Sequence, residues 1–93
     1  MERLDEAAIA RALESLPAWQ RQGDALVREL KFKNFREAMA FVNRVAEVAE
    51  EQRHHPDITI RYNRVQLLLT THEAGGITER DVEFARRVDE LVS

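Results

Sequence analysis

The chain has 93 residues, of which 44% are hydrophobic and 33% are charged, and its net charge is −3. This length fits one globular domain, residues 1–93, with a modest core. The absence of cysteine excludes disulfides, thiolate nucleophiles and cysteine-ligated metals, and the acidic balance argues against a nucleic-acid partner.

The N-terminal third is predicted to form a helix and then a β-hairpin. Apolar residues recur at helical spacing from Asp5 to Leu16, and Pro17 ends this pattern. Gly23-Asp24 supplies a turn between the strands AWQRQ and ALVRELKF. The acidic start is unlike a secretory signal, and no run approaches the ~20 apolar residues of a membrane span, so we expect a cytoplasmic protein without membrane contact.

The clearest predicted element is a long helix that follows Asn34, whose side chain can cap it together with a glutamate three residues later. The helix should end near Arg53, because Pro56 disfavours helical angles at the residue before it. Phe41 and Val48 are interpreted as a second apolar ridge that contacts another subunit, the alternative being two isolated surface residues. The predicted core stripe contains Phe35, Ala38, Met39, Val42, Val45, Ala46 and Ala49.

A second hairpin and a last helix complete the predicted fold. Apolar residues alternate over 58–62 and again over 65–69, with a tight turn at Asn63-Arg64. Thr78 follows two glycines and can cap the last helix. The order α-β-β-α-β-β-α indicates an α+β fold, a four-stranded antiparallel sheet with three helices on one face.

All three histidines flank the second hairpin. His54 and His55 precede its first strand and His72 ends its second strand, so antiparallel pairing should bring the three imidazoles together. Imidazole has an unperturbed pKa of about 6.5 and can exchange protons near neutrality. Glu50 lies four residues before His54 and is expected to face it on the helix. The two serines lie far from this cluster in sequence, which disfavours covalent hydrolase chemistry.

Three other interpretations of these residues stay open. The histidines could be structural side chains with hydrogen-bonded nitrogens. They could hold a transition metal with a carboxylate, although adjacent side chains such as His54 and His55 diverge and bind one ion poorly. Asp81, three residues after Thr78, could serve only as part of a helix cap.

The stretch from Glu50 to Tyr62, E-EQR-HHP-DITIR-Y, resembles the signature of the pterin-4a-carbinolamine dehydratases. The continuation YNRVQLLLTTHEAGGITERD and the preceding helix FKNFREAMAFVNRVAEVAE are similar to that family as well, so the resemblance covers residues 19–91. It implies the fold order given above, homodimers or homotetramers, and a reaction that needs neither a metal nor an organic cofactor.

The resemblance also implies a function. Such a lyase removes water from 4a-hydroxytetrahydrobiopterin to give a quinonoid dihydropterin, which recycles the pterin cofactor of aromatic amino-acid hydroxylases. The implied catalytic residues are His54 and His72 as the acid/base pair, with His55 binding the pterin; the roles of the two adjacent histidines could be exchanged. Glu50 would tune His54, and Asp81 would support His72. Two alternatives are a non-catalytic dimerisation module of the coactivator type and a dehydratase fold that acts on another pterin.

Overall fold

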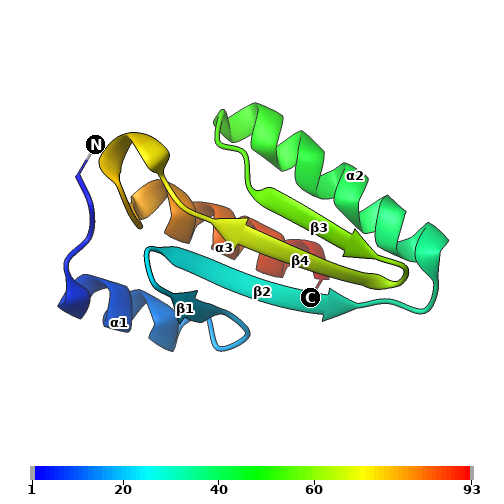
Figure 1. Cartoon of the computed structure of the whole chain (residues 1–93), viewed down its shortest axis with the longest axis horizontal. Helices are drawn as coiled ribbons and strands as arrows, with labels where there is room; N and C mark the ends of the chain where they lie inside the picture. Colours follow the sequence, from blue (N-terminus) through cyan, green and yellow to red (C-terminus); the bar gives the residue numbers. More distant parts are fainter. Residues whose placement is uncertain (1, 93) are drawn as a thin grey trace.

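The computed structural model describes residues 2–92, and their helices and strands follow the predicted order α-β-β-α-β-β-α (Figure 1). A short 3-10 helix, η1, is added before the last helix. Within residues 2–92, no helix is both long enough and apolar enough to cross a membrane. The elements are α1 (Glu6–Glu14), β1 (Gln20–Gln22), β2 (Ala25–Lys31), α2 (Phe35–Gln52), β3 (Asp57–Arg61), β4 (Arg64–Leu69), η1 (His72–Ala74) and α3 (Glu79–Val92).

The four strands form one antiparallel sheet in the order β1-β2-β4-β3, so the predicted fold class is confirmed. Helices α2 and α3 pack against each other and against the central strand β4 (Figure 1). The alternation in β4 places Val65, Leu67 and Leu69 in the core, where all three are fully buried. A strand register shifted by one residue would turn these side chains out of the core, and burial therefore sets the register.

Short-range signals begin and end the elements as predicted. Asn34 accepts a hydrogen bond from the backbone N–H of Glu37 at 2.9 Å and caps α2. Gly23 adopts a φ of 60° between β1 and β2, a backbone angle that glycine takes without steric cost. Arg53 ends α2 in the left-handed conformation with a φ of 52°. This turn of the backbone determines the directions of the two residues that follow.

The predicted subunit ridge on α2 is wrong. Phe41 and Val48 are each only 3% exposed and belong to the core, whereas Phe35 is 49% exposed. The centroid of the Phe41 ring lies 5.0 Å from that of Phe32, which directly follows β2, so the two rings pack together at the end of this strand. Two neighbouring apolar stripes both follow helical spacing on α2, and its buried face includes members of both. The buried residues of α2 are Ala38, Phe41, Val45, Val48 and Ala49.

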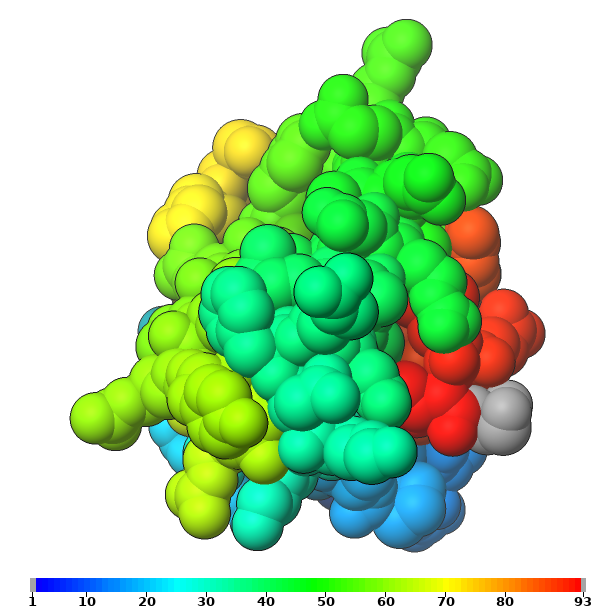
Figure 2. All heavy atoms as spheres, turned by 90° about the vertical axis from the view of Figure 1, so that its right-hand side faces the viewer, coloured from blue at the N-terminus to red at the C-terminus, as the bar shows by residue number. Residues whose placement is uncertain are grey.

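The turn of the second hairpin also differs from the prediction. Its two residues are Tyr62 and Asn63, because Arg64 already pairs with Lys31 and Arg61 in the sheet. Asn63 exchanges hydrogen bonds with the backbone of Phe32, and both are 2.8 Å long. These bonds hold the turn beside the start of α2, at the end of the molecule that faces the viewer in Figure 2.

Candidate active site

The end of α2 sends two adjacent histidines in different directions. Because Arg53 is left-handed, the chain leaves the helix sharply, and the backbone N–H of His54 still bonds to the carbonyl of Ala49 at 3.1 Å. His54 turns inward and is 8% exposed, whereas His55 stays on the surface. One backbone kink therefore gives two neighbouring imidazoles different environments.

The start of α3 supplies a buried carboxylate. Asp81 is fully buried, and its Oδ2 accepts hydrogen bonds from the backbone N–H of Thr78 and from the hydroxyl of Thr71, both at 2.9 Å. The bond to Thr78 is the predicted cap of α3, so Asp81 does have a capping role. Only one carboxylate oxygen is used in this way, which leaves Oδ1 for another partner.

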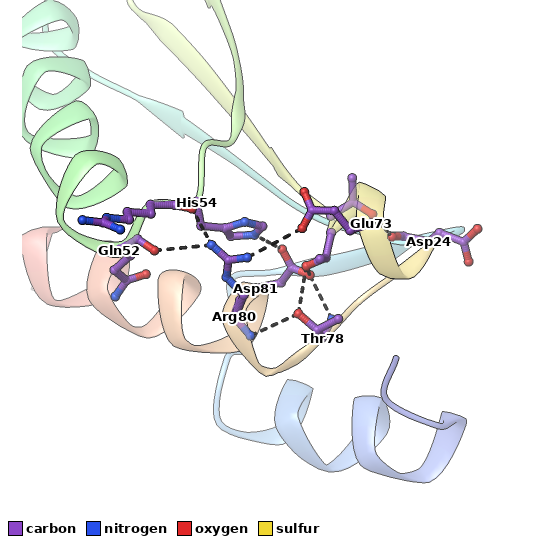
Figure 3. Close-up of polar contacts among 10 residues, drawn as sticks. Asp24, Gln52, His54, Glu73, Thr78, Arg80 and Asp81 are labelled. Carbon is purple, nitrogen blue, oxygen red and sulfur yellow. Dashed lines mark hydrogen bonds and ion pairs between the residues drawn. The ribbon is translucent and has the colours of Figure 1, made fainter. Parts of the chain in front are cut away.

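That partner is His54. Its Nε2 lies 2.5 Å from Asp81 Oδ1 (Figure 3). Its ring makes a T-shaped contact with the ring of Phe84, with the centroids 6.3 Å apart. The expectation that Asp81 supports His72 is therefore wrong, since its carboxylate faces His54. A carboxylate on one ring nitrogen fixes the orientation of an imidazole and leaves the other nitrogen for chemistry.

The expected pair of Glu50 and His54 is also wrong. Glu50 Oε2 lies 2.7 Å from His55 Nε2, and both side chains are exposed. The expectation assumed that the helix continues through residue 54, but α2 ends at Gln52 and the backbone turns at Arg53. His54 therefore leaves the helical face that carries Glu50, and His55 takes its place.

His72 lies on the surface in η1, directly after β4. Within residues 2–92, no hydrogen bond or ring contact joins one imidazole to another. Its neighbour Glu73 approaches Arg80 at 3.8 Å, and Arg80 lies beside His54 in Figure 3. The segment of His72 thus borders the region of His54, but the three imidazole rings do not contact one another within residues 2–92.

An open cleft of about 520 Å³ lies where α2 ends and α3 begins. Clefts of about 300–1,000 Å³ commonly hold small organic ligands, so a bicyclic ring fits this size. Arg80 closes one side by donating to the backbone carbonyls of Gln52 and Arg53. The lining residues are Gln52, His54, Glu79, Arg80 and Glu83.

Sequence reasoning missed Arg80 and Thr71. No local sequence signal marks Thr71, because the burial of Asp81, which creates the need for a further donor, is a property of the tertiary structure. No local signal marks Arg80 either, whose partners Gln52 and Arg53 lie 28 and 27 residues away. In the part of the chain that the structure describes, no three His, Cys, Asp or Glu side chains are grouped as metal ligands would be.

Known proteins are similar to this chain in sequence and in fold. The sequence model of the family described as "Pterin 4 alpha carbinolamine dehydratase" matches residues 2–91. A protein of Thermomicrobium roseum, provisionally named a pterin-4-alpha-carbinolamine dehydratase, is 75% identical over 93 residues, which is 100% of both chains. A protein of Acidobacterium capsulatum with the same provisional name is 53% identical over 92 residues, covering 99% of this chain and 100% of the relative.

Two solved structures are similar. A protein of Brucella melitensis, described as a transcriptional coactivator/pterin dehydratase, has a TM-score of 0.95 and 37% identity, covering 99% of this chain and 100% of the other. A pterin dehydratase-like protein, described as a RuBisCO assembly factor in the alpha-carboxysome, has a TM-score of 0.69 and 29% identity, covering 82% and 90%. By family model, sequence identity and fold, the chain belongs to the pterin-4a-carbinolamine dehydratase family.

Proposed function

We propose that this protein dehydrates 4a-hydroxytetrahydropterins to quinonoid dihydropterins and so returns the pterin cofactor of aromatic amino-acid hydroxylases to use. The observation that carries the proposal is the buried His54–Asp81 pair, in which His54 lines a ligand-sized cleft. A buried imidazole that is oriented by a carboxylate and borders a cleft is a group suited to proton transfer. Membership of the family supports this choice of substrate.

The reaction needs two proton movements. The C4a–O bond breaks as the leaving oxygen takes a proton and departs as water, and a ring nitrogen loses a proton as the C=N bond forms. We assign these steps to His54 and His72, and each such transfer typically contributes ~10²–10⁴-fold to the rate. The buried pair with Asp81 favours His54 as the more rigidly held of the two.

His55 and Glu50 are assigned to binding. Their side chains form an exposed pair at the end of α2, the element that also supplies Gln52 to the cleft. A pterin ring carries N–H groups, and the carboxylate of Glu50 can accept hydrogen bonds from them. The imidazole ring of His55 can stack on the pterin ring. Binding rather than proton transfer suits a pair that is exposed to water.

The deciding experiment is a dehydration assay on chemically prepared 4a-hydroxytetrahydropterin, measured against the spontaneous rate. The wild-type protein should accelerate the loss of water, and His72→Ala should lower turnover at least ~10²-fold without changing the unfolding transition. A wild-type rate equal to the spontaneous rate would contradict the function. A His72→Ala variant within a few-fold of wild type would remove only the role of His72.

A homo-oligomer is part of the proposal. Strand β3 forms one edge of the sheet, and its sequence DITIR has opposite charges at its two ends. Within residues 2–92, neither Asp57 nor Arg61 takes part in an ion pair, and Ile60 between them is exposed. Antiparallel pairing of two copies about Thr59 sets Asp57 of each opposite Arg61 of the other, which covers the unpaired edge.

Charge reversal tests this pairing. Arg61→Asp places like charges opposite each other at both ends of the paired strands, so the dissociation constant in sedimentation experiments should rise at least tenfold. The double variant Asp57→Arg/Arg61→Asp restores opposite charges and should restore association. Equal association constants for wild type, single and double variants would exclude β3 as the interface.

The alternative of a non-catalytic binding module draws on the description of two structural neighbours as a coactivator and an assembly factor. Phe41 and Val48 do not offer an exposed surface for such a partner, because both are buried in the core. The dehydration assay separates the two functions, since a module without catalysis leaves the spontaneous rate unchanged.

A further inference from the structure

The hydroxyl of Thr71 belongs to a chain of hydrogen bonds whose direction can be derived. Thr71 Oγ1 lies 2.8 Å from Thr78 Oγ1 and 2.9 Å from Asp81 Oδ2, and all three side chains are fully or almost fully buried. Thr78 Oγ1 also accepts the backbone N–H of Arg80 at 3.2 Å. Each hydroxyl has one hydrogen to donate, so the chain can run toward Asp81 or away from it.

Only the direction toward Asp81 satisfies every donor. In that direction Thr78 donates to Thr71, and Thr71 donates to Asp81 Oδ2, which also accepts the backbone N–H of Thr78. In the opposite direction the Thr78 hydroxyl hydrogen has no acceptor among residues 2–92, although the side chain is fully buried. Unpaired buried donors are costly, and the first direction is therefore the stable one.

This direction leaves Asp81 Oδ2 as an acceptor from two donors. A proton shared within the His54–Asp81 pair must then lie between Oδ1 and Nε2, the two atoms 2.5 Å apart (Figure 3). An acceptor carboxylate on Nε2 favours the imidazole form that keeps its hydrogen on Nε2. Nδ1 is consequently the nitrogen of His54 that gains and loses the working proton.

The surroundings of Nδ1 agree with that role. Within residues 2–92, no fully buried side-chain nitrogen or oxygen of a non-exposed residue lacks a hydrogen-bond partner. The hydrogen bond of the His54 ring in this part of the chain is made by Nε2, so Nδ1 must reach the surface. His54 borders the cleft, and this exposed nitrogen can meet a ligand there.

We propose that Thr71 is a positioning residue, whose hydroxyl holds Asp81 so that His54 keeps a hydrogen on Nε2 and presents Nδ1 to the substrate. The catalytic consequence rests on the proposed dehydratase function, whereas the state of the His54 ring does not. Loss of the Thr71 hydroxyl removes one of the two hydrogen bonds to Oδ2 and loosens the carboxylate, so both ring tautomers of neutral His54 become populated.

The direct test is nitrogen NMR of the histidine-labelled protein over a pH series, read for the neutral form of His54. Wild type should show the hydrogen on Nε2 and a bare Nδ1. Thr71→Val should show a mixture of tautomers, and Thr71→Ser should return the wild-type pattern. Thr70→Val is the matched control, because its hydroxyl bonds the backbone carbonyl of Asp24 at 2.7 Å, outside this network. Thr71→Ala replaces the valine variant if the latter does not fold.

Kinetics give the second measurement. Thr71→Val should lower kcat at least ~10-fold with KM changed less than twofold, while Thr71→Ser and Thr70→Val stay within twofold of wild type. A wild-type His54 that carries its hydrogen on Nδ1, or an unchanged tautomer in Thr71→Val, would overturn the proposal. If the protein proves not to be a dehydratase, the NMR result still decides the role of Thr71.

Discussion

Two histidine–carboxylate pairs start from adjacent residues and have opposite surroundings. In the pair of His54 and Asp81 the side chains are 8% and 0% exposed, whereas in the pair of His55 and Glu50 they are 63% and 78% exposed. The two distances, 2.5 Å and 2.7 Å, are similar. Burial and the additional hydrogen-bond donors to Asp81, rather than the contact distance, therefore decide which imidazole is held in a single orientation.

The largest expected difference between the pairs is in stability. Asp81→Ala leaves His54 and the donors of Thr71 and Thr78 without their acceptor, and should reduce the free energy of unfolding by about 3–5 kcal/mol. Glu50→Ala breaks an exposed pair and should cost less than about 1 kcal/mol. Urea unfolding of both variants measures the difference, and equal losses would contradict the contrast between buried and exposed pairs.

The second difference is in kinetics. His54→Ala should lower kcat at least ~10²-fold, because it removes a group assigned to proton transfer. His55→Ala should mainly raise KM, since its assigned role is binding that is equal in the ground state and the transition state. Steady-state rates with the 4a-hydroxytetrahydropterin substrate separate kcat from KM. The assignment of the two histidines must be exchanged if His55→Ala lowers kcat and His54→Ala changes KM alone.

The smallest expected effect concerns a third pair at the surface, formed by Arg21 and Glu6. The guanidinium of Arg21 hydrogen-bonds Glu6 at 2.5 Å, and this bond together with the positive charge lowers the pKa of Glu6 below its ordinary 4.5. Because the folded-state pKa is the lower one, the pair stabilises the fold above the pKa of the unfolded chain, and this contribution is lost as the pH falls through the folded-state value.

The measurement for this third pair is the melting temperature of Glu6→Gln as a function of pH. At neutral pH the variant should melt slightly below wild type, and the gap should close in acid as Glu6 becomes protonated. Glu2→Gln is a control in which no ion pair of residues 2–92 is removed. A gap that stays constant down to acid pH would show that the ion pair is not its cause.

Much of the fold was predictable because its signals are local. The cap at Asn34, the turn at Gly23 and the alternation from Val65 to Leu69 depend on residues within one turn of helix or one strand. The errors arose where a local pattern allows two answers. On α2, two neighbouring stripes both follow helical spacing, and only the packing of the helix shows that the buried face includes Phe41 together with Ala38 and Val45.

The candidate site divides in the same way. The sequence by itself determined the residue types, the three imidazoles beside one hairpin and the acidic residue at the start of the last helix. The tertiary structure alone decided the partners, since His54 lies 27 residues from Asp81 and Thr71 lies 10 residues from it. Local rules describe hydrogen bonds within a turn of helix, but a left-handed residue at Arg53 and the packing of α3 against α2 select the carboxylate that each histidine meets.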